Sequence, residues 1–169
     1  MKRVLLTIVA LVFAVGITSA QNYMVVNSEK VFKSLSDYNK ALEQIESLSE
    51  SYQKQVDAKF AEVENLYNAY MSRKSSLSAG ERQQWEQTIL SKESEATTLQ
   101  ETLFGAEGEL MKRRMELIQP VQQRVFATLE SFAKQYGYDL VIDISANPLV
   151  LYYSNKVDFT DKIIESLKR

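Results

Sequence analysis

Apolar residues recur at helical spacing in two long stretches of the chain, and the stretches mirror each other about Ala79 and Gly80. Steps of three, four and seven residues put each set on one helix face. The outgoing set is Tyr38, Leu42, Ile45, Tyr52, Val56, Val63, Leu66 and Tyr70. The returning set is Trp85, Ile89, Ala96, Leu99, Leu103, Ala106, Leu110, Leu117 and Val121. Folding the chain at this point brings Val56 opposite Leu103, so the pattern predicts a hairpin of two antiparallel helices.

The predicted hairpin covers residues 37–119, and each arm would be roughly 60 Å long at about 1.5 Å per residue. Ser78, followed three residues later by Glu81, matches a capping box at the start of the returning helix. Pro120 lies deep in the helical pattern, where it would kink or restart the helix. We therefore expect the arm to end at this proline.

Gly105 and Gly108 lie inside the returning arm, each at a cost of about 1 kcal/mol relative to alanine in a helix. In the mirrored register they flank the position opposite Tyr52. Two interpretations stay open. The missing side chains make room for the Tyr52 ring, or the glycines form a flexible joint that lets the arm bend.

Short β-forming runs lie near both ends of the chain. Residues 23–27 are expected to form one strand, and residues 138–144 and 149–153 a β-hairpin around a turn at residues 145–148. A final helix is predicted over residues 159–168.

The predicted fold class is α+β and mostly α. A small β-containing body is made of residues 21–36 and 120–169, and the long helical hairpin is inserted between these two segments. Three short strands are marginally stable alone, and their apolar content exceeds what one small body needs. We read the excess as an oligomer interface. The expected interface residues are Val25, Val26, Leu140, Val141, Ile142, Leu149 and Leu151.

The first twenty residues have the pattern of a signal peptide. Lys2 and Arg3 form a positive n-region, residues 4–17 an apolar h-region, and residues 18–20 a run of small residues. The apolar run is too short to span a bilayer in the usual way. We expect cleavage after residue 20, with an uncleaved anchor as the alternative. No cysteine follows the run, which excludes lipid attachment of the bacterial lipoprotein kind.

The expected mature chain is acidic. Without Lys2 and Arg3 it keeps 18 of the 20 basic residues against 22 acidic ones, a net charge of -4. Fifteen carboxylates and ten cations lie in residues 37–119, so the arms carry the acidity. This balance argues against nucleic acid as a partner.

The sequence offers little catalytic chemistry. It has no histidine, the usual general base and metal ligand, and no cysteine for a disulfide or a thiolate site. It contains no nucleophile elbow, phosphate-binding loop or dinucleotide fingerprint. We therefore expect no enzymatic activity, no cofactor and no metal site.

Aromatic side chains gather along the distal part of the arms. A two-helix hairpin has one seam in which to bury them, so some must remain partly exposed and could make adaptable apolar contacts with another chain. The alternative is that these rings simply widen the seam. The candidate binding residues are Tyr52, Phe60, Tyr67, Tyr70 and Trp85.

Together, the signal, the opening strand, the hairpin and the C-terminal motifs resemble the Skp/OmpH family of periplasmic chaperones over the whole mature chain. The most specific parts are the runs at residues 136–143 (YGYDLVID) and 157–161 (VDFTD). The resemblance implies a jellyfish-like trimer whose body strands build the trimer core. Its three arms enclose a cavity for unfolded outer-membrane proteins, without ATP. The best-known members are strongly basic and this chain is acidic, so no charge-based client or lipid site is carried over.

The leading hypothesis is therefore an ATP-independent periplasmic holdase that binds unfolded outer-membrane β-barrel proteins as a homotrimer. Its oligomer interface would then be a trimer interface, and its distal aromatic residues would contact the client. No stable membrane insertion is expected after signal cleavage. The alternative is a structural coiled-coil spacer or adaptor of the envelope with no client-binding activity.

Overall fold

The structure, a computed structural model, describes residues 22–146 and 149–168 of the 169-residue chain. The predicted signal peptide at residues 1–20 and part of the predicted turn, residues 147–148, lie outside the described residues. The chain divides into two units. The β unit consists of the two ends, up to Lys30 and from Thr128, and the arm unit of Val31–Ala127. The predicted fold class, α+β and mostly α with a long helical hairpin, is confirmed.

Strand β1 (Tyr23–Val26) is central to the β unit. It pairs in parallel with β2 (Leu140–Asp143), in register from its first residue to its last. On the other edge of β1, the backbone N–H of Val25 donates to the carbonyl of Val157 at 2.8 Å, and its carbonyl accepts from the N–H of Phe159 at 3.0 Å. Segments from both ends of the chain therefore share one small sheet.

The third strand, predicted at residues 149–153, does not form, so the predicted β-hairpin is wrong. These residues are irregular, and Leu149, Leu151 and Tyr152 are almost fully exposed. High β-propensity reflects how well a side chain fits a paired, half-buried surface, and this segment joins no sheet among the described residues. The partner of β2 is β1 instead.

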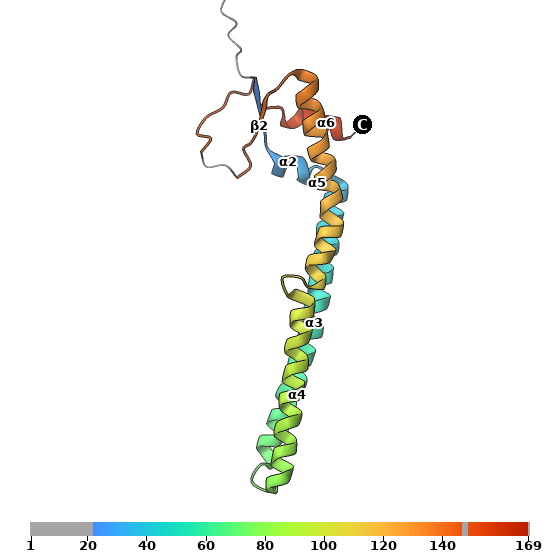
Figure 1. Cartoon of the computed structure of the whole chain (residues 1–169), viewed down its shortest axis with the longest axis vertical. Helices are drawn as coiled ribbons and strands as arrows, with labels where there is room; N and C mark the ends of the chain where they lie inside the picture. The colour runs from blue at the N-terminus through green and yellow to red at the C-terminus, as the bar shows by residue number, and fades with distance from the viewer. Residues whose placement is uncertain (1–21, 147–148, 169) are drawn as a thin grey trace, which may run out of the picture. The chain divides into compact units, whose positions relative to one another are not determined.

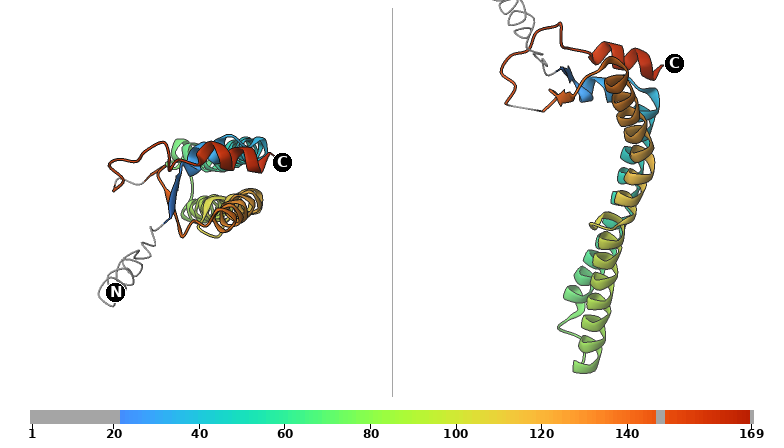
Figure 2. Two further views of the ribbon diagram at one scale, coloured as in Figure 1. Left: turned by 90° about the horizontal axis from the view of Figure 1, so that it is seen from above. Right: turned by 45° about the horizontal axis from the view of Figure 1, so that its top comes forward.

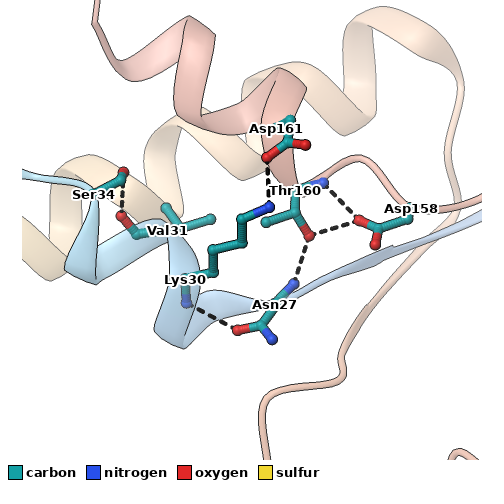
Figure 3. Close-up of polar contacts among 7 residues, drawn as sticks. All are labelled: Asn27, Lys30, Val31, Ser34, Asp158, Thr160 and Asp161. Atoms are coloured by element: carbon teal, nitrogen blue, oxygen red, sulfur yellow. Dashed lines mark hydrogen bonds and ion pairs between the residues drawn. The ribbon is translucent and has the colours of Figure 1, made fainter. Parts of the chain in front are cut away.

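Polar contacts connect the end of β1 to helix α6 (Thr160–Leu167), as Figure 3 shows. The backbone N–H of Asn27 donates to Thr160 Oγ1 at 2.9 Å, and the Thr160 hydroxyl donates to Asp158 Oδ1 at 2.6 Å. Lys30 Nζ lies 2.8 Å from Asp161 Oδ1, and this hydrogen bond together with the carboxylate charge raises the pKa of Lys30. The buried hydroxyl of Thr160 is thus satisfied on both sides.

Asp143, the last residue of β2, holds the start of helix α2 (Ser28–Lys33). Its carboxylate accepts hydrogen bonds from the backbone N–H and the hydroxyl of both Ser28 and Ser145. Partial burial raises the pKa of Asp143, but these hydrogen bonds outweigh it and lower the pKa below the ordinary 3.8. The resulting stabilisation is present above that ordinary value and is lost as the pH falls through the folded-state pKa.

The arm unit contains α3 (Ser36–Arg73), α4 (Ala79–Phe104) and the first part of α5 (Glu109–Tyr136). Helices α3 and α4 run antiparallel and side by side, which confirms the predicted hairpin (Figures 1 and 2). The capping box is also confirmed, because Ser78 accepts from the N–H of Glu81 and the Glu81 carboxylate accepts from the N–H of Ser78. The turn lies at residues 74–78, and α4 begins directly after Ser78, as the capping box predicts.

Helix α5 runs through Pro120 without restarting, so the restart predicted there is wrong, while the kink stays a prediction. A proline inside a helix costs about 3 kcal/mol because it removes one hydrogen bond and crowds the preceding turn. Ile118, Val121 and Val125 form a buried stripe across this point, and the burial of these side chains offsets that cost.

The returning arm is interrupted instead at Gly105–Gly108, where a short loop separates α4 from α5 (Figure 1). A Cβ on Gly105 would stand 2.4 Å from the carbonyl oxygen of Glu101, and a Cβ on Gly108 2.9 Å from that of Leu103. The glycines therefore allow a close approach of the backbone within the loop, a role that neither of the two interpretations named.

Contacts across the hairpin follow two different registers, one on each side of this loop. On the distal side, toward the turn, Tyr70 meets Trp85 and Glu86, whereas the mirror about Ala79 places it opposite Ile89. On the proximal side, Asp37 Oδ2 lies 2.7 Å from Arg124 Nη2. The residues of the loop absorb the difference between the two registers.

Candidate functional site

The distal hairpin is organised around Tyr70, which is 3% exposed. Its hydroxyl donates to Glu86 Oε1 at 2.5 Å, and this hydrogen bond, with a smaller contribution from burial, raises the pKa of Tyr70. Trp85 stacks on the Tyr70 ring with centroids 6.3 Å apart and planes 22° apart. Lys74 Nζ lies 5.4 Å from the centroid of the same ring, within the range of a cation–π contact. Tyr70 therefore fixes the spacing of α3 and α4 near the turn.

Beside this cluster, α3 and α4 form a groove of about 680 Å³, which we call the distal groove. Most of its lining is apolar, and it lies wholly within the arm unit. Its residues are Phe60, Val63, Glu64, Tyr67, Tyr70, Met71, Lys74, Glu86, Ile89, Leu90 and Glu93. The volume is within the range of sites that hold a few side chains or a small ligand.

Large apolar side chains in the distal groove remain open to solvent. Tyr67 is 50% exposed, Met71 48% and Leu90 64%, and Phe60 is exposed as well. They form a contiguous set along two helices, unlike apolar residues scattered singly over a surface. Such a patch is typical of a surface that contacts another molecule.

The five candidate residues from the sequence separate into two groups. Phe60, Tyr67 and Tyr70 line the distal groove, and Trp85 stacks on the last of them. Tyr52 lies elsewhere on α3, where its ring packs nearly perpendicular to that of Phe104 with centroids 6.3 Å apart. The structure thus gathers four of the five around one surface, and their role as a binding site stays a prediction.

Sequence reasoning missed two parts of the distal groove, the exposed side chains of Met71 and Leu90 and the charges. Met71 follows Tyr67 by four residues, and Tyr67 follows Phe60 by seven, so these three form a second stripe beside the outgoing one. That spacing could have identified them. The carboxylates of Glu64, Glu86 and Glu93 carry no such signal, because single charged residues on a helix are ordinary.

The seven residues expected at an oligomer interface differ in how much of each side chain is exposed. Val25 and Val26 are each 2% exposed within this one chain, so little of their side chains is left for a second chain. Val141 and Ile142 are half-buried, whereas Leu140, Leu149 and Leu151 are exposed. The exposed leucines are therefore the members best placed to meet another copy.

In the part of the chain that the structure describes, no three carboxylate or other metal-binding side chains gather where they could hold an ion. Over the same residues, none of the helices combines the length and the apolar character that crossing a bilayer requires.

These features define a protein with a helical hairpin arm that carries an open apolar groove. The model of the OmpH-like outer membrane protein family matches residues 22–167, so the chain belongs to this family. The chaperone protein Skp of Photorhabdus laumondii is 23% identical over 160 residues, covering 95% of this chain and 93% of its own.

The fold is shared with a solved structure, an OmpH-like outer membrane chaperone of Caulobacter crescentus. The TM-score is 0.68 at 11% sequence identity, over 88% of this chain and 85% of that one. At this identity the likeness shows the fold alone. Family membership and the Skp relative support a chaperone role for the chain.

Proposed function

We propose that the chain is an ATP-independent periplasmic holdase that binds unfolded outer-membrane proteins in a cavity enclosed by the helical arms of a trimer. Membership of the OmpH-like family and the named chaperone relative support this proposal. The observation that carries it is the distal groove, where Tyr67, Met71 and Leu90 stay open to solvent on one apolar surface.

Each groove would hold its client weakly. Ordering an unfolded segment and its side chains costs free energy, so one groove of this size gives modest affinity. Three arms on one trimer raise the effective concentration of the remaining grooves once the first is occupied. The client is then retained through several weak contacts, and it leaves without an energy source as those contacts open in turn.

The trimer would be formed by the β unit. Leu140, Leu149 and Leu151 are exposed in the single chain and would be covered by neighbouring copies. Burying large side chains of this kind stabilises by roughly 1.5–3 kcal/mol each. The irregular segment that carries Leu149 and Leu151 would gain strand structure only when another copy supplies a partner.

The test is suppression of aggregation. A denatured outer-membrane β-barrel protein is diluted into buffer with the purified protein, at about one trimer per client, and light scattering is followed. We expect scattering to be suppressed, and the mass of the assembly to be that of a trimer without the client and of a trimer plus one client with it. Unchanged aggregation would support the spacer alternative, and a monomer or dimer mass would overturn the trimeric cavity.

A matched pair of variants tests the groove itself. Tyr67→Ser with Leu90→Ser removes two exposed apolar side chains from the distal groove. Leu42→Ser with Met115→Ser removes two side chains of similar exposure from the proximal side. We expect the first pair to weaken suppression several-fold and the second to leave it unchanged. Equal effects would mean that the distal groove has no special role.

A further inference from the structure

Two carboxylates at the distal groove have no partner among the described residues. Glu64 lies on α3 and Glu93 on α4, so one comes from each side of the groove. Both are exposed, and neither makes a hydrogen bond or an ion pair in the described part of the chain. The third groove carboxylate, Glu86, accepts the hydrogen bond of Tyr70 instead.

The lysines near the groove are already engaged, and the charge of Arg82 acts on Tyr70. Lys74, the cation that lines the groove, lies over the ring of Tyr70. Lys92 Nζ is 3.5 Å from Glu62 and 3.0 Å from Glu95, and Lys59 also pairs with Glu62. The distal groove therefore presents apolar walls together with negative charge that this chain leaves unmatched.

An occupant that is only apolar would fit this groove poorly. Covering the groove with apolar atoms takes water away from Glu64 and Glu93, and an unpaired carboxylate that loses water is costly. An acidic segment would add repulsion to that cost. A lysine or arginine next to the bound apolar side chain would instead supply a charge-assisted hydrogen bond. An arginine could also lie against the exposed ring of Tyr67.

We infer that the distal groove selects segments of unfolded polypeptide in which an aromatic or aliphatic side chain lies next to a lysine or arginine, and disfavours acidic segments. This inference rests on the proposed function and names the kind of segment that the arm holds. The walls provide the affinity through burial of apolar surface, and Glu64 and Glu93 provide the discrimination between basic and acidic segments.

The test compares two dye-labelled peptides that lack tryptophan and share the same phenylalanine and leucine positions, one with lysines and the other with glutamates between them. Anisotropy of the dye measures the affinity for the purified protein. Emission of Trp85, the one tryptophan in the sequence, reports binding at the groove, because its ring stacks on Tyr70. We expect the lysine peptide to bind roughly tenfold more tightly, and the ratio to shrink with added salt.

Matched variants test whether the two groove carboxylates cause the preference for the lysine peptide. Glu64→Gln with Glu93→Gln neutralises the two groove carboxylates, and Glu46→Gln with Glu50→Gln makes the same change in net charge on the proximal part of α3. We expect the first pair to reduce the tenfold ratio to about one- to threefold and the second to preserve it. Equal reductions would mean that net charge, not the groove, selects the segment, and would overturn the inference.

Other outcomes separate this inference from the proposed function. If the two peptides bind equally while aggregation of the client is suppressed, the inference fails and the holdase stands. If neither peptide binds and aggregation continues, both fail. A change in Trp85 emission with protein concentration alone would place a second copy of this chain in the groove, and would also overturn the inference.

Discussion

The proximal and distal parts of the hairpin share α3 but use it differently. On the proximal side, α5 presents a regular buried stripe of Ile118, Val121 and Val125, and an ion pair joins Asp37 to Arg124. On the distal side, α4 buries only Ala96 and Leu103, and large apolar side chains remain open in the groove. One helical hairpin thus contains a section that serves stability and a section whose exposed surface is available for binding.

The largest expected effect tests this division with one charge on each side. Val125 is 0% exposed and Leu90 is 64% exposed. Val125→Asp buries an unpaired carboxylate and should lower the free energy of unfolding by more than about 4 kcal/mol, or prevent folding. Leu90→Asp leaves its charge in water and should change it by less than about 0.5 kcal/mol. Urea unfolding followed by circular dichroism, at one protein concentration, measures both.

The two unfolding free energies together show whether the distal side is a structural core. If Leu90→Asp destabilises as much as Val125→Asp, the distal side is as much a structural core as the proximal side. The groove would then be a packing defect rather than a binding surface.

The loop between the two parts provides the next test. Gly105→Ala would place a Cβ 2.4 Å from the carbonyl oxygen of Glu101, so the backbone must shift, at a cost of about 1–3 kcal/mol. Gly80→Ala is the matched control, because nothing lies within 4 Å of its Cβ position and alanine favours a helix by up to about 1 kcal/mol. The first variant should lower the unfolding free energy and the second should hold or raise it. Accelerated hydrogen exchange around residue 105 would locate the strain.

Equal behaviour of the two glycine variants would contradict the close backbone approach at Gly105. The two interpretations drawn from the sequence, room for the Tyr52 ring and a flexible joint, would then be left to explain why glycine stands there.

Much of the arm could be predicted from the sequence, because helical periodicity is a local property. The helices and the capping box at Ser78 follow from spacing alone. The register could not be predicted in the same way. The sequence pattern assumes one pairing register for the whole hairpin. The loop at Gly105–Gly108 shifts the pairing, so the two sides have different registers, visible at Tyr70 and at Asp37.

The β unit shows a different limit of sequence reasoning. Residues 149–153 have strong β-propensity, but a strand needs a partner, and propensity does not say whether the partner belongs to the same chain. At Pro120, local reasoning overestimated the tendency of the proline to end the helix, because buried neighbours on both sides keep the helix continuous. The groove charges carry no periodic signal and become meaningful only when α3 and α4 are placed side by side.

The smallest expected effect concerns the one hydrogen bond that organises the distal side. The carboxylate of Glu86 stabilises the protonated form of Tyr70 and raises its pKa. The contribution to stability is therefore present below the ordinary tyrosine pKa of about 10 and is lost as the pH rises through the folded-state pKa. Glu86→Gln removes the charged acceptor, so the pKa of Tyr70 should fall toward its ordinary value. NMR titration of labelled tyrosine rings measures the shift, with Glu64→Gln, which leaves the Tyr70 hydrogen bond intact, as the control. A Tyr70 titration that is identical in the Glu86→Gln variant and the unmodified chain would show that this bond does not hold the distal side together.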